Sequence, residues 1–251
     1  MQATFPGRVA RLVLFGAEAL AAAFSPSTYT APARRIAARQ VCASAWQVLP
    51  AFILACAILG ALVIRIVDST ARDFGLSGYS LDLYFRVLVL ELLPLFVALF
   101  VAIRSGAALG TEVALWRAQG ELEPHRSGSA DPLRAELLPR GIGMTAAVLA
   151  LTAIGCLVAL LVAYAGLYGL SPWGHAAYAR AIGHVFAPAV LAGFALKVVF
   201  FAVAVAVMPV AAGLASSRDL RSVPDAAPRG LVGIFVVLAL VEAVSLAVKY
   251  A

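Results

Sequence analysis

Three charged side chains, Glu91, Lys197 and Glu242, lie inside long apolar runs of this 251-residue chain. A charge at the centre of a membrane span costs roughly 2.5–3.5 kcal/mol on insertion scales, so such residues face a protein interior or water. Lys197 lies about 15 Å into its run at 1.5 Å per residue, too deep for easy snorkelling, whereas Glu91 is near enough to an end for snorkelling to explain it. Two interpretations stay open: a polar cluster that lines or gates a pathway, and a structural pair such as Lys197 with Glu242.

A charged segment from Glu112 to Arg140 separates two of the most apolar parts of the chain. Its first part, GTEVALWRAQGELE, is rich in helix formers, the following PHRSGSADP is rich in turn formers, and Asp131-Pro132 predicts a new helix start. Trp116 and Arg117 are residue types enriched at interface hot spots, and Glu121 offers a charge to a basic partner. From the residues alone, a docking surface for a soluble protein and a solvated hairpin are equally open.

Enzymatic chemistry is not predicted for this chain. It contains no G-x-x-x-x-G-K-[ST] loop to hold a triphosphate, and no nucleophile–base constellation stands out. The cysteines have no CxxC spacing and are interpreted as small buried hydrophobes, and the histidines as surface groups, so no metal site is predicted. These residues are Cys42, Cys56, Cys156, His125, His175 and His184.

The composition is that of a polytopic membrane protein. Hydrophobic residues make up 63% of the chain and charged residues 13%, against about 45–50% and 25% in soluble domains. Since a transmembrane helix needs about 20 mostly apolar residues, we expect an all-α bundle in a single domain. The predicted spans are residues 41–64, 83–109, 142–165, 187–210 and 231–248.

The distribution of basic residues predicts the orientation. Arginines gather in the N-terminal segment, in the charged segment and before the fifth span, which places all three in the cytoplasm and the C-terminus in the periplasm. The net charge of +6 is therefore attributed to membrane flanks rather than to nucleic-acid binding. Residues 5–24, with Arg8, Arg11 and Glu18 on one helical face, predict an amphipathic interfacial helix that remains in the mature protein; a cleaved signal peptide is the alternative.

The stretch LELLPLFVALFVAIRSGAALGTEVALWRAQGELE, followed by DPLRAELLPR, resembles the MlaE/YrbE family of ABC-transporter permeases, which work with proteins of the MCE (mammalian cell entry) class. Lys197 stands at the family's lysine, and Glu242 stands where the family usually has aspartate. The resemblance covers nearly the whole chain and is strongest in the charged segment. The matching residues there are Glu91, Pro94, Arg104, Gly106, Ala108, Glu112, Asp131, Pro132, Leu133, Arg134, Pro139 and Arg140.

The resemblance implies five transmembrane helices after the interfacial helix, in the bacterial inner membrane. Residues 111–139 would form a cytoplasmic coupling loop that docks on a separate ABC ATPase subunit, and that partner would bind ATP and magnesium, leaving this chain without a cofactor. The cargo would be phospholipid, exchanged with a periplasmic MCE protein, expected as a hexamer, and a second permease copy or a paralogue would complete a dimer. The coupling residues would be Glu112, Trp116, Arg117, Glu121, Asp131 and Arg134.

Two further groups of residues are assigned roles from their chemistry and spacing. Glu91, Lys197 and Glu242 would be the intramembrane polar residues of a lipid pathway. Gly106 and Gly110 form a G-x-x-x-G that permits close helix approach, and Arg104 is grouped with them. Pro50 and Pro94 are expected to kink their spans and open a cavity between helices.

The chain also departs from the family pattern, which keeps other functions open. Leu90 stands where the family usually has arginine, and Pro124 and Gly128 should shorten the docking helix. The alternatives are a permease for a sterol, fatty acid or other hydrophobic solute, and a divergent scaffold subunit in a heterodimer. A third alternative is a proton-coupled secondary transporter. The five predicted spans show no inverted repeat, which argues against it.

Overall fold

The computed structural model describes residues 31–121, 136–169, 171–217 and 219–250, and every regular element among them is a helix. Five helical stretches are long and apolar enough to cross a membrane, which confirms the expected all-α fold with five spans. The predicted interfacial helix, residues 5–24, lies outside the described residues. The five stretches are Ala33–Asp73, Ser80–Gln119, Leu138–Tyr168, Pro188–Ala215 and Ala226–Lys249.

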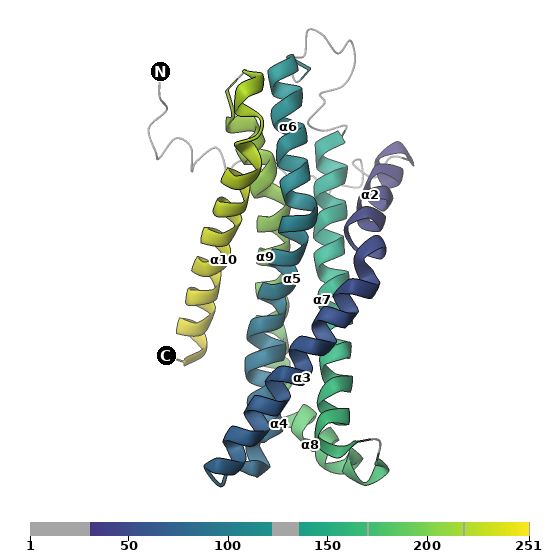
Figure 1. The fold of residues 1–251 in the computed structure, drawn as a ribbon, viewed down its shortest axis with the longest axis vertical. Helices are drawn as coiled ribbons and strands as arrows, with labels where there is room; N and C mark the ends of the chain where they lie inside the picture. The colour runs from purple at the N-terminus through teal and green to yellow at the C-terminus, as the bar shows by residue number, and fades with distance from the viewer. Residues whose placement is uncertain (1–30, 122–135, 170, 218, 251) are drawn as a thin grey trace.

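The first stretch consists of α2 (Ala31–Ser44) and α3 (Leu49–Asp73), which are joined by the 3₁₀ turn η2 (Trp46–Val48). Pro50 lies in the first turn of α3, where a proline costs no helical hydrogen bond. The first span, predicted at residues 41–64, is thus broken close to Pro50, but the break lies at the η2 turn, before the proline. Figure 1 shows α2 and α3 crossing the bundle obliquely, with α7 (Leu138–Tyr168) beside both.

The second stretch, which follows the 3₁₀ turn η3 (Ser77–Tyr79), is one continuous helix with two π-helical segments. It consists of α4 (Ser80–Tyr84), the π-helical η4 (Phe85–Leu92), α5 (Leu93–Val101), the π-helical η5 (Ala102–Gly106) and α6 (Ala107–Gln119). Pro94 has no N–H for the carbonyl of Leu90, four residues earlier, and the Leu93 N–H bonds to the Leu88 carbonyl five residues back. The π-helical turn accommodates the proline.

The remaining elements complete a bundle with two distinct ends. After α7 come η7 (Pro172–Gly174), α8 (His175–Val185), α9 (Pro188–Ala215), η8 (Leu220–Ser222) and α10 (Ala226–Tyr250). Figure 1 shows the ends of α6 and α9 and the starts of α7 and α10 at one end, here called the α6 end. The opposite end, the α8 end, holds α4, α8 and the end of α3, and α10 stops well short of it.

Aromatic side chains fill the core at the α8 end. Phe85 of η4 packs against Tyr178 of α8 and against Phe186, with ring centroids 5.7 and 5.6 Å apart. The Tyr178 hydroxyl donates to the Leu160 carbonyl of α7 at 2.6 Å. Burial raises the pKa of Tyr178 to about 12, so it keeps the proton that makes this bond. These contacts fasten α8 to η4 and α7.

Glycines from three helices surround Pro209, which lies inside α9 near the α6 end. A Cβ added at Gly106 would lie 3.2 Å from Pro209 Cγ, and one at Gly110 would lie 3.2 Å from the Pro209 carbonyl oxygen. Gly230 of α10 approaches Pro209 Cα in the same way, at 3.3 Å. The close approach expected from Gly106 and Gly110 is thus present, with α9 as the partner helix. Arg104 takes no part in it, because its side chain is exposed.

The charged segment is organised differently from the separate docking helix that the sequence predicted. Helix α6 continues the second span without a break to Gln119, and Gly120, with φ of 75°, ends it in the left-handed region. Helical structure resumes at Glu136 and Leu137, one turn before α7. The predicted coupling loop, residues 111–139, is therefore helical at both ends. Leu122–Ala135 lies outside the described residues.

Candidate functional site

Four charged side chains from three helices meet inside the bundle and form what we call the charged cluster: Glu91, Lys197, Glu242 and Lys249. Lys197 of α9 is at the centre, with only 4% of its side chain exposed. Its Nζ forms an ion pair with Glu91 Oε2 of η4 and lies 2.7 Å from Glu242 Oε2 of α10. Lys249 Nζ, near the end of α10, lies 2.6 Å from Glu91 Oε1.

The second span positions Glu91 and supplies a further acceptor. Because Pro94 leaves the Leu90 carbonyl without its usual helical donor, that oxygen is available to another group. Lys197 Nζ donates to it at 3.3 Å, in addition to pairing with Glu91. The sequence LELLP thus presents a carboxylate and a backbone carbonyl to the same ammonium group.

Helix α10 presents its charges on the face that packs against the bundle. Ala226, Gly230, Ile234 and Leu238 are buried at intervals of four residues. Glu242 follows at the same interval, and Lys249 lies seven residues further, again on that face. The contact stripe of α10 therefore changes from apolar to charged halfway along the helix.

The charged cluster is electrically balanced, since two carboxylates meet two ammonium groups. Glu91 contacts both lysines, and Lys197 contacts both carboxylates. Glu242 Oε2 is buried and lies within ionic distance of Lys197 but makes no hydrogen bond of acceptable geometry. Glu242 is therefore the more weakly held of the two carboxylates, since Glu91 pairs with both lysines.

The structure confirms the predicted pairing of Lys197 with Glu242 and corrects two other expectations. Glu91 does not snorkel to the membrane surface, because its carboxylate is held between two lysines within the protein. Lys249 directly follows the fifth predicted span, residues 231–248, and the sequence therefore predicts a charge that flanks the outer side; in the structure its side chain contacts Glu91 inside the bundle. The seven-residue spacing from Glu242 to Lys249 was the signal that could have placed both on one helical face.

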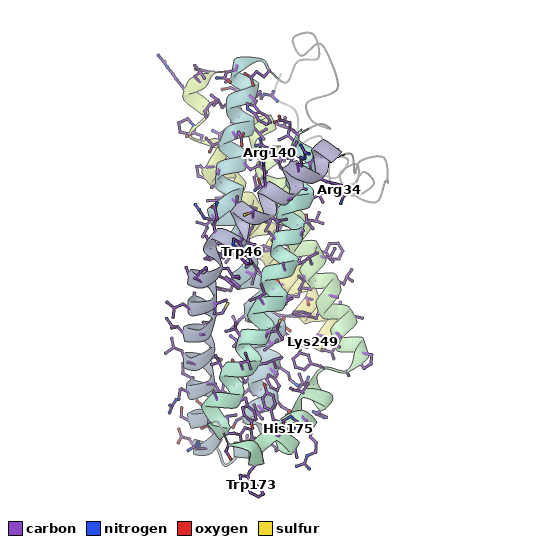
Figure 2. The ribbon with its side chains drawn as sticks, turned by 90° about the vertical axis from the view of Figure 1, so that its right-hand side faces the viewer. Arg34, Trp46, Arg140, Trp173, His175 and Lys249 are labelled. Carbon is purple, nitrogen blue, oxygen red and sulfur yellow. The ribbon has the colours of Figure 1, made fainter. Side chains whose placement is uncertain are left out.

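A second group of charges braces α6 against α7 at the α6 end. Arg140 Nη1 lies 2.6 Å from Glu112 Oε2, and the Arg140 guanidinium lies 5.1 Å from the centre of the Trp116 ring. Arg140 also reaches Glu136 Oε2, at 3.5 Å. Figure 2 shows Arg140 near this end of the molecule and Trp173 and His175 near the other, with Lys249 between them.

The predicted docking residues lie in three different situations. Trp116 is partly buried beneath Arg140, and Arg117 donates to the Leu214 carbonyl at the end of α9. Both side chains thus hold the bundle together, whereas Glu121 is exposed to a partner. Val113, one turn before Trp116, is buried against α9. Asp131 and Arg134 lie outside the described residues.

The cysteines and histidines follow the predictions with one exception. Cys56 is buried and Cys156 half-buried, as expected, but Cys42 of α2 is exposed. His175 is exposed, and His184, also largely exposed, lies 2.9 Å from Asp82 of α4. His125 lies outside the described residues. These groups are therefore separate from the charged cluster.

Comparison with known proteins places this arrangement in a family. No curated protein matches the chain. The family model described as Permease MlaE matches residues 37–248, which include all five apolar helices almost entirely, Glu91, Lys197 and Glu242. With most of its length covered by that match, the chain belongs to the MlaE permease family and is a transmembrane permease subunit of the ABC-transporter type.

Proposed function

We propose that this permease moves phospholipid between the bacterial inner membrane and a periplasmic MCE protein, and so serves outer-membrane lipid homeostasis. The observation that carries the proposal is the charged cluster, a balanced set of two carboxylates and two lysines enclosed by apolar helices. Acyl chains suit the apolar walls, and a polar headgroup needs charged partners at some point of its passage. Sugars or free ions would find few partners elsewhere in such a bundle.

The energy would come from a separate ABC ATPase subunit that holds ATP and magnesium and docks at the α6 end. Leu115 and Glu121 are exposed there and are available to a partner. The Glu112–Arg140 ion pair connects α6 to α7, so a displacement of α6 on docking would also move α7. In the proposed arrangement the α6 end and the N-terminus lie in the cytoplasm and the C-terminus lies on the periplasmic side. The same orientation follows from the arginine distribution.

Two other partners complete the proposed complex. An MCE protein, as a hexamer, would receive or deliver lipid at the periplasmic face. A second permease copy or a paralogue would complete a dimer, as a transporter with two ATPase subunits requires. Helix α10 offers an exposed apolar face that includes Val232, Phe235 and Leu240, and lipid or the second permease would cover it.

Identification of the cargo in the native complex tests the proposal. The permease is purified with its partners from the source membrane, its bound lipids are identified by mass spectrometry, and the complex is then reconstituted between two liposome populations. We expect glycerophospholipid to copurify and ATP to drive its transfer to or from the MCE protein. Copurified sterol or fatty acid, with no phospholipid transfer, would establish one of the alternative cargoes. A complex that transfers lipid equally well without this chain would identify it as a scaffold.

A further inference from the structure

The outward side of α2 and η2 carries three arginines and a tryptophan, and we call it the α2 arginine face: Arg34, Arg35, Arg39 and Trp46. All four residues are exposed, Trp46 to 72%. Arg39 follows Arg35 by four residues and Trp46 follows Arg39 by seven, so these three lie on one side of the helix. Helix α2 contains no acidic residue, so its outward side is strongly basic.

Close packing against α7 fixes the direction of the α2 arginine face. A Cβ added at Gly143 of α7 would lie 2.7 Å from the Ala37 carbonyl oxygen and 2.8 Å from Gln40 Cβ. Gln40 Nε2 also donates to the hydroxyl of the buried Ser44, at 3.1 Å. The opposite side of α2 therefore contacts the backbone of α7 directly, and a rotation of α2 that hid the arginines would break this contact.

The α2 arginine face lies at the level of lipid headgroups. Residues 46–64 form a mostly apolar stretch of 19 residues that ends before Arg65. It is about 28 Å long, close to the roughly 30 Å thickness of the hydrocarbon layer. Trp46 is then at the membrane boundary, where tryptophans gather, and the arginines lie beyond it. Figure 2 shows Arg34 near the α6 end and Trp46 farther from it, with α2 running obliquely between them, so the arginines stay close to the membrane surface.

The three arginines have no acidic partner among the residues that the structure describes. Glu112 and Glu136, two carboxylates at the same end of the bundle, are both engaged by Arg140. Like charges one helical turn apart, such as Arg35 and Arg39, repel each other, and a bound anion relieves that repulsion. The anions that a membrane offers at this level are lipid phosphates.

We propose that the α2 arginine face binds an anionic phospholipid of the surrounding membrane, with the lipid phosphate between Arg35 and Arg39 and an acyl chain against Trp46. A guanidinium group can form two parallel hydrogen bonds with a phosphate, which an ammonium group cannot. A lipid of net negative charge is selected over a zwitterionic one, because the described part of this face offers no carboxylate to a lipid ammonium group. The site is separate from the charged cluster, and the inference does not depend on which solute is transported.

Lipid retention by charge variants tests the inference. The full-length permease, in its complex, is placed in nanodiscs with equal amounts of phosphatidylglycerol and phosphatidylethanolamine, and retained lipids are counted by native mass spectrometry. The wild type is expected to retain phosphatidylglycerol preferentially. Arg35→Gln with Arg39→Gln should lower the ratio of phosphatidylglycerol to phosphatidylethanolamine about tenfold, which corresponds to roughly 1.4 kcal/mol. Arg35→Lys with Arg39→Lys keeps the charges and should lower the ratio less.

A matched control separates this site from a general effect of charge. Arg65→Gln with Arg180→Gln also removes two exposed arginines, but from the half of the molecule toward the α8 end. This control should retain the two lipids in the wild-type ratio. All the substituted side chains are exposed, so the variants are expected to fold, and equal melting temperatures in detergent check this.

A fluorophore on Cys42 locates the bound lipid. Cys42 is exposed and lies between Arg39 and Trp46 in the sequence, on the α2 arginine face. With Cys56 and Cys156 replaced by alanine, the label should be quenched more strongly by phosphatidylglycerol with brominated acyl chains than by the corresponding phosphatidylethanolamine. In the double glutamine variant the two lipids should quench it equally.

The possible outcomes decide the inference without deciding the cargo. A folded double glutamine variant with the wild-type lipid ratio overturns the site, and so does an equal loss in the control. Equal quenching of the wild-type label by the two lipids also overturns it, and this measurement needs no arginine variant to fold. A label that neither lipid quenches shows that protein, such as the ATPase subunit, covers the face, which overturns it as well. ATP-driven phospholipid transfer tests the proposed function separately.

Discussion

Lys249 Nζ lies 2.6 Å from Glu91 Oε1, although 158 residues separate the two in the sequence. This contact joins the end of the last helix to the second span. It also means that Glu91 is shared by two lysines, so removal of either lysine leaves the carboxylate with one cation. The two lysines are nevertheless expected to differ in their contribution to stability, because Lys197 also pairs with Glu242.

Lys197→Met should be the more damaging lysine substitution. It removes the ammonium group that pairs with Glu242, and breaking a buried pair costs about 3–5 kcal/mol. The added change Glu242→Leu should recover part of that loss, because Glu91 still has Lys249. The free energy of unfolding of the detergent-solubilised protein measures both. A double variant as unstable as the two single losses added together would contradict the pairing.

Lys249→Met should loosen only the outer half of α10. The apolar contacts of Ala226, Ile234 and Leu238 remain, whereas the contact with Glu91 is lost. Hydrogen exchange, followed by mass spectrometry, should become faster in Val241–Val248 and stay unchanged in the first half of the helix. Lys249→Arg keeps the charge and serves as the control. Uniform protection along α10 in the methionine variant would show that the charged contact does not hold the helix.

Pro94→Ala should restore an ordinary helical hydrogen bond to the Leu90 carbonyl. The new N–H would compete with Lys197 for that oxygen and would remove the reason for the π-helical turn that carries Glu91. We expect stability to hold or to rise slightly, while ATP-driven lipid transfer falls. Pro50→Ala, in the first turn of α3, is the control and should change neither. Unchanged transfer in Pro94→Ala would mean that the shape of η4 is unimportant for transport.

Gly213→Ala should destabilise the contact between α6 and α9. The added Cβ would lie 2.7 Å from the Gly110 carbonyl oxygen and 2.7 Å from Val113 Cβ, so backbone would have to move. Overpacking of this kind costs about 1–3 kcal/mol. Gly193→Ala in the same helix meets no atom within 4 Å and should stabilise by up to about 1 kcal/mol through helix propensity. Equal melting temperatures for the two variants would contradict the close packing.

Leu115→Glu with Glu121→Arg should weaken binding of the ATPase subunit without unfolding the permease. Both side chains are exposed near the α6 end. The double change Trp116→Ala with Arg117→Glu is a poorer test, because it would also break contacts with Arg140 and Leu214 and so combine a loss of docking with a loss of stability. Copurification of the ATPase measures the effect, and Arg180→Glu near the opposite end is the control. Undiminished copurification in the Leu115 and Glu121 variant would argue against docking on these residues.

Features that depend on local sequence were predictable. The five spans follow from runs of apolar residues, because the length and hydropathy of a segment decide whether it can cross a membrane. The need for partners around Lys197 followed from its depth alone, since a charge that cannot reach water must be paired. The close approach at Gly106 and Gly110 followed from their four-residue spacing, although the sequence could not name Pro209 as the residue that fills the gap.

Features that depend on how helices are placed against each other were decided only by the tertiary structure. Lys249 follows the last span in the sequence, and only the position of α10 beside α9 and the second span brings it to Glu91. The sequence predicted that Trp116 and Arg117 are docking residues. In the structure, the rotation of α6 about its own axis, relative to α7 and α9, directs their side chains toward Arg140 and Leu214. Apolar periodicity determines which face of a helix is buried, but it does not determine how far the helix is shifted along the bundle axis relative to helices distant in the sequence. Because two side chains form an ion pair only within a few ångströms, that shift determines which charged residues become partners.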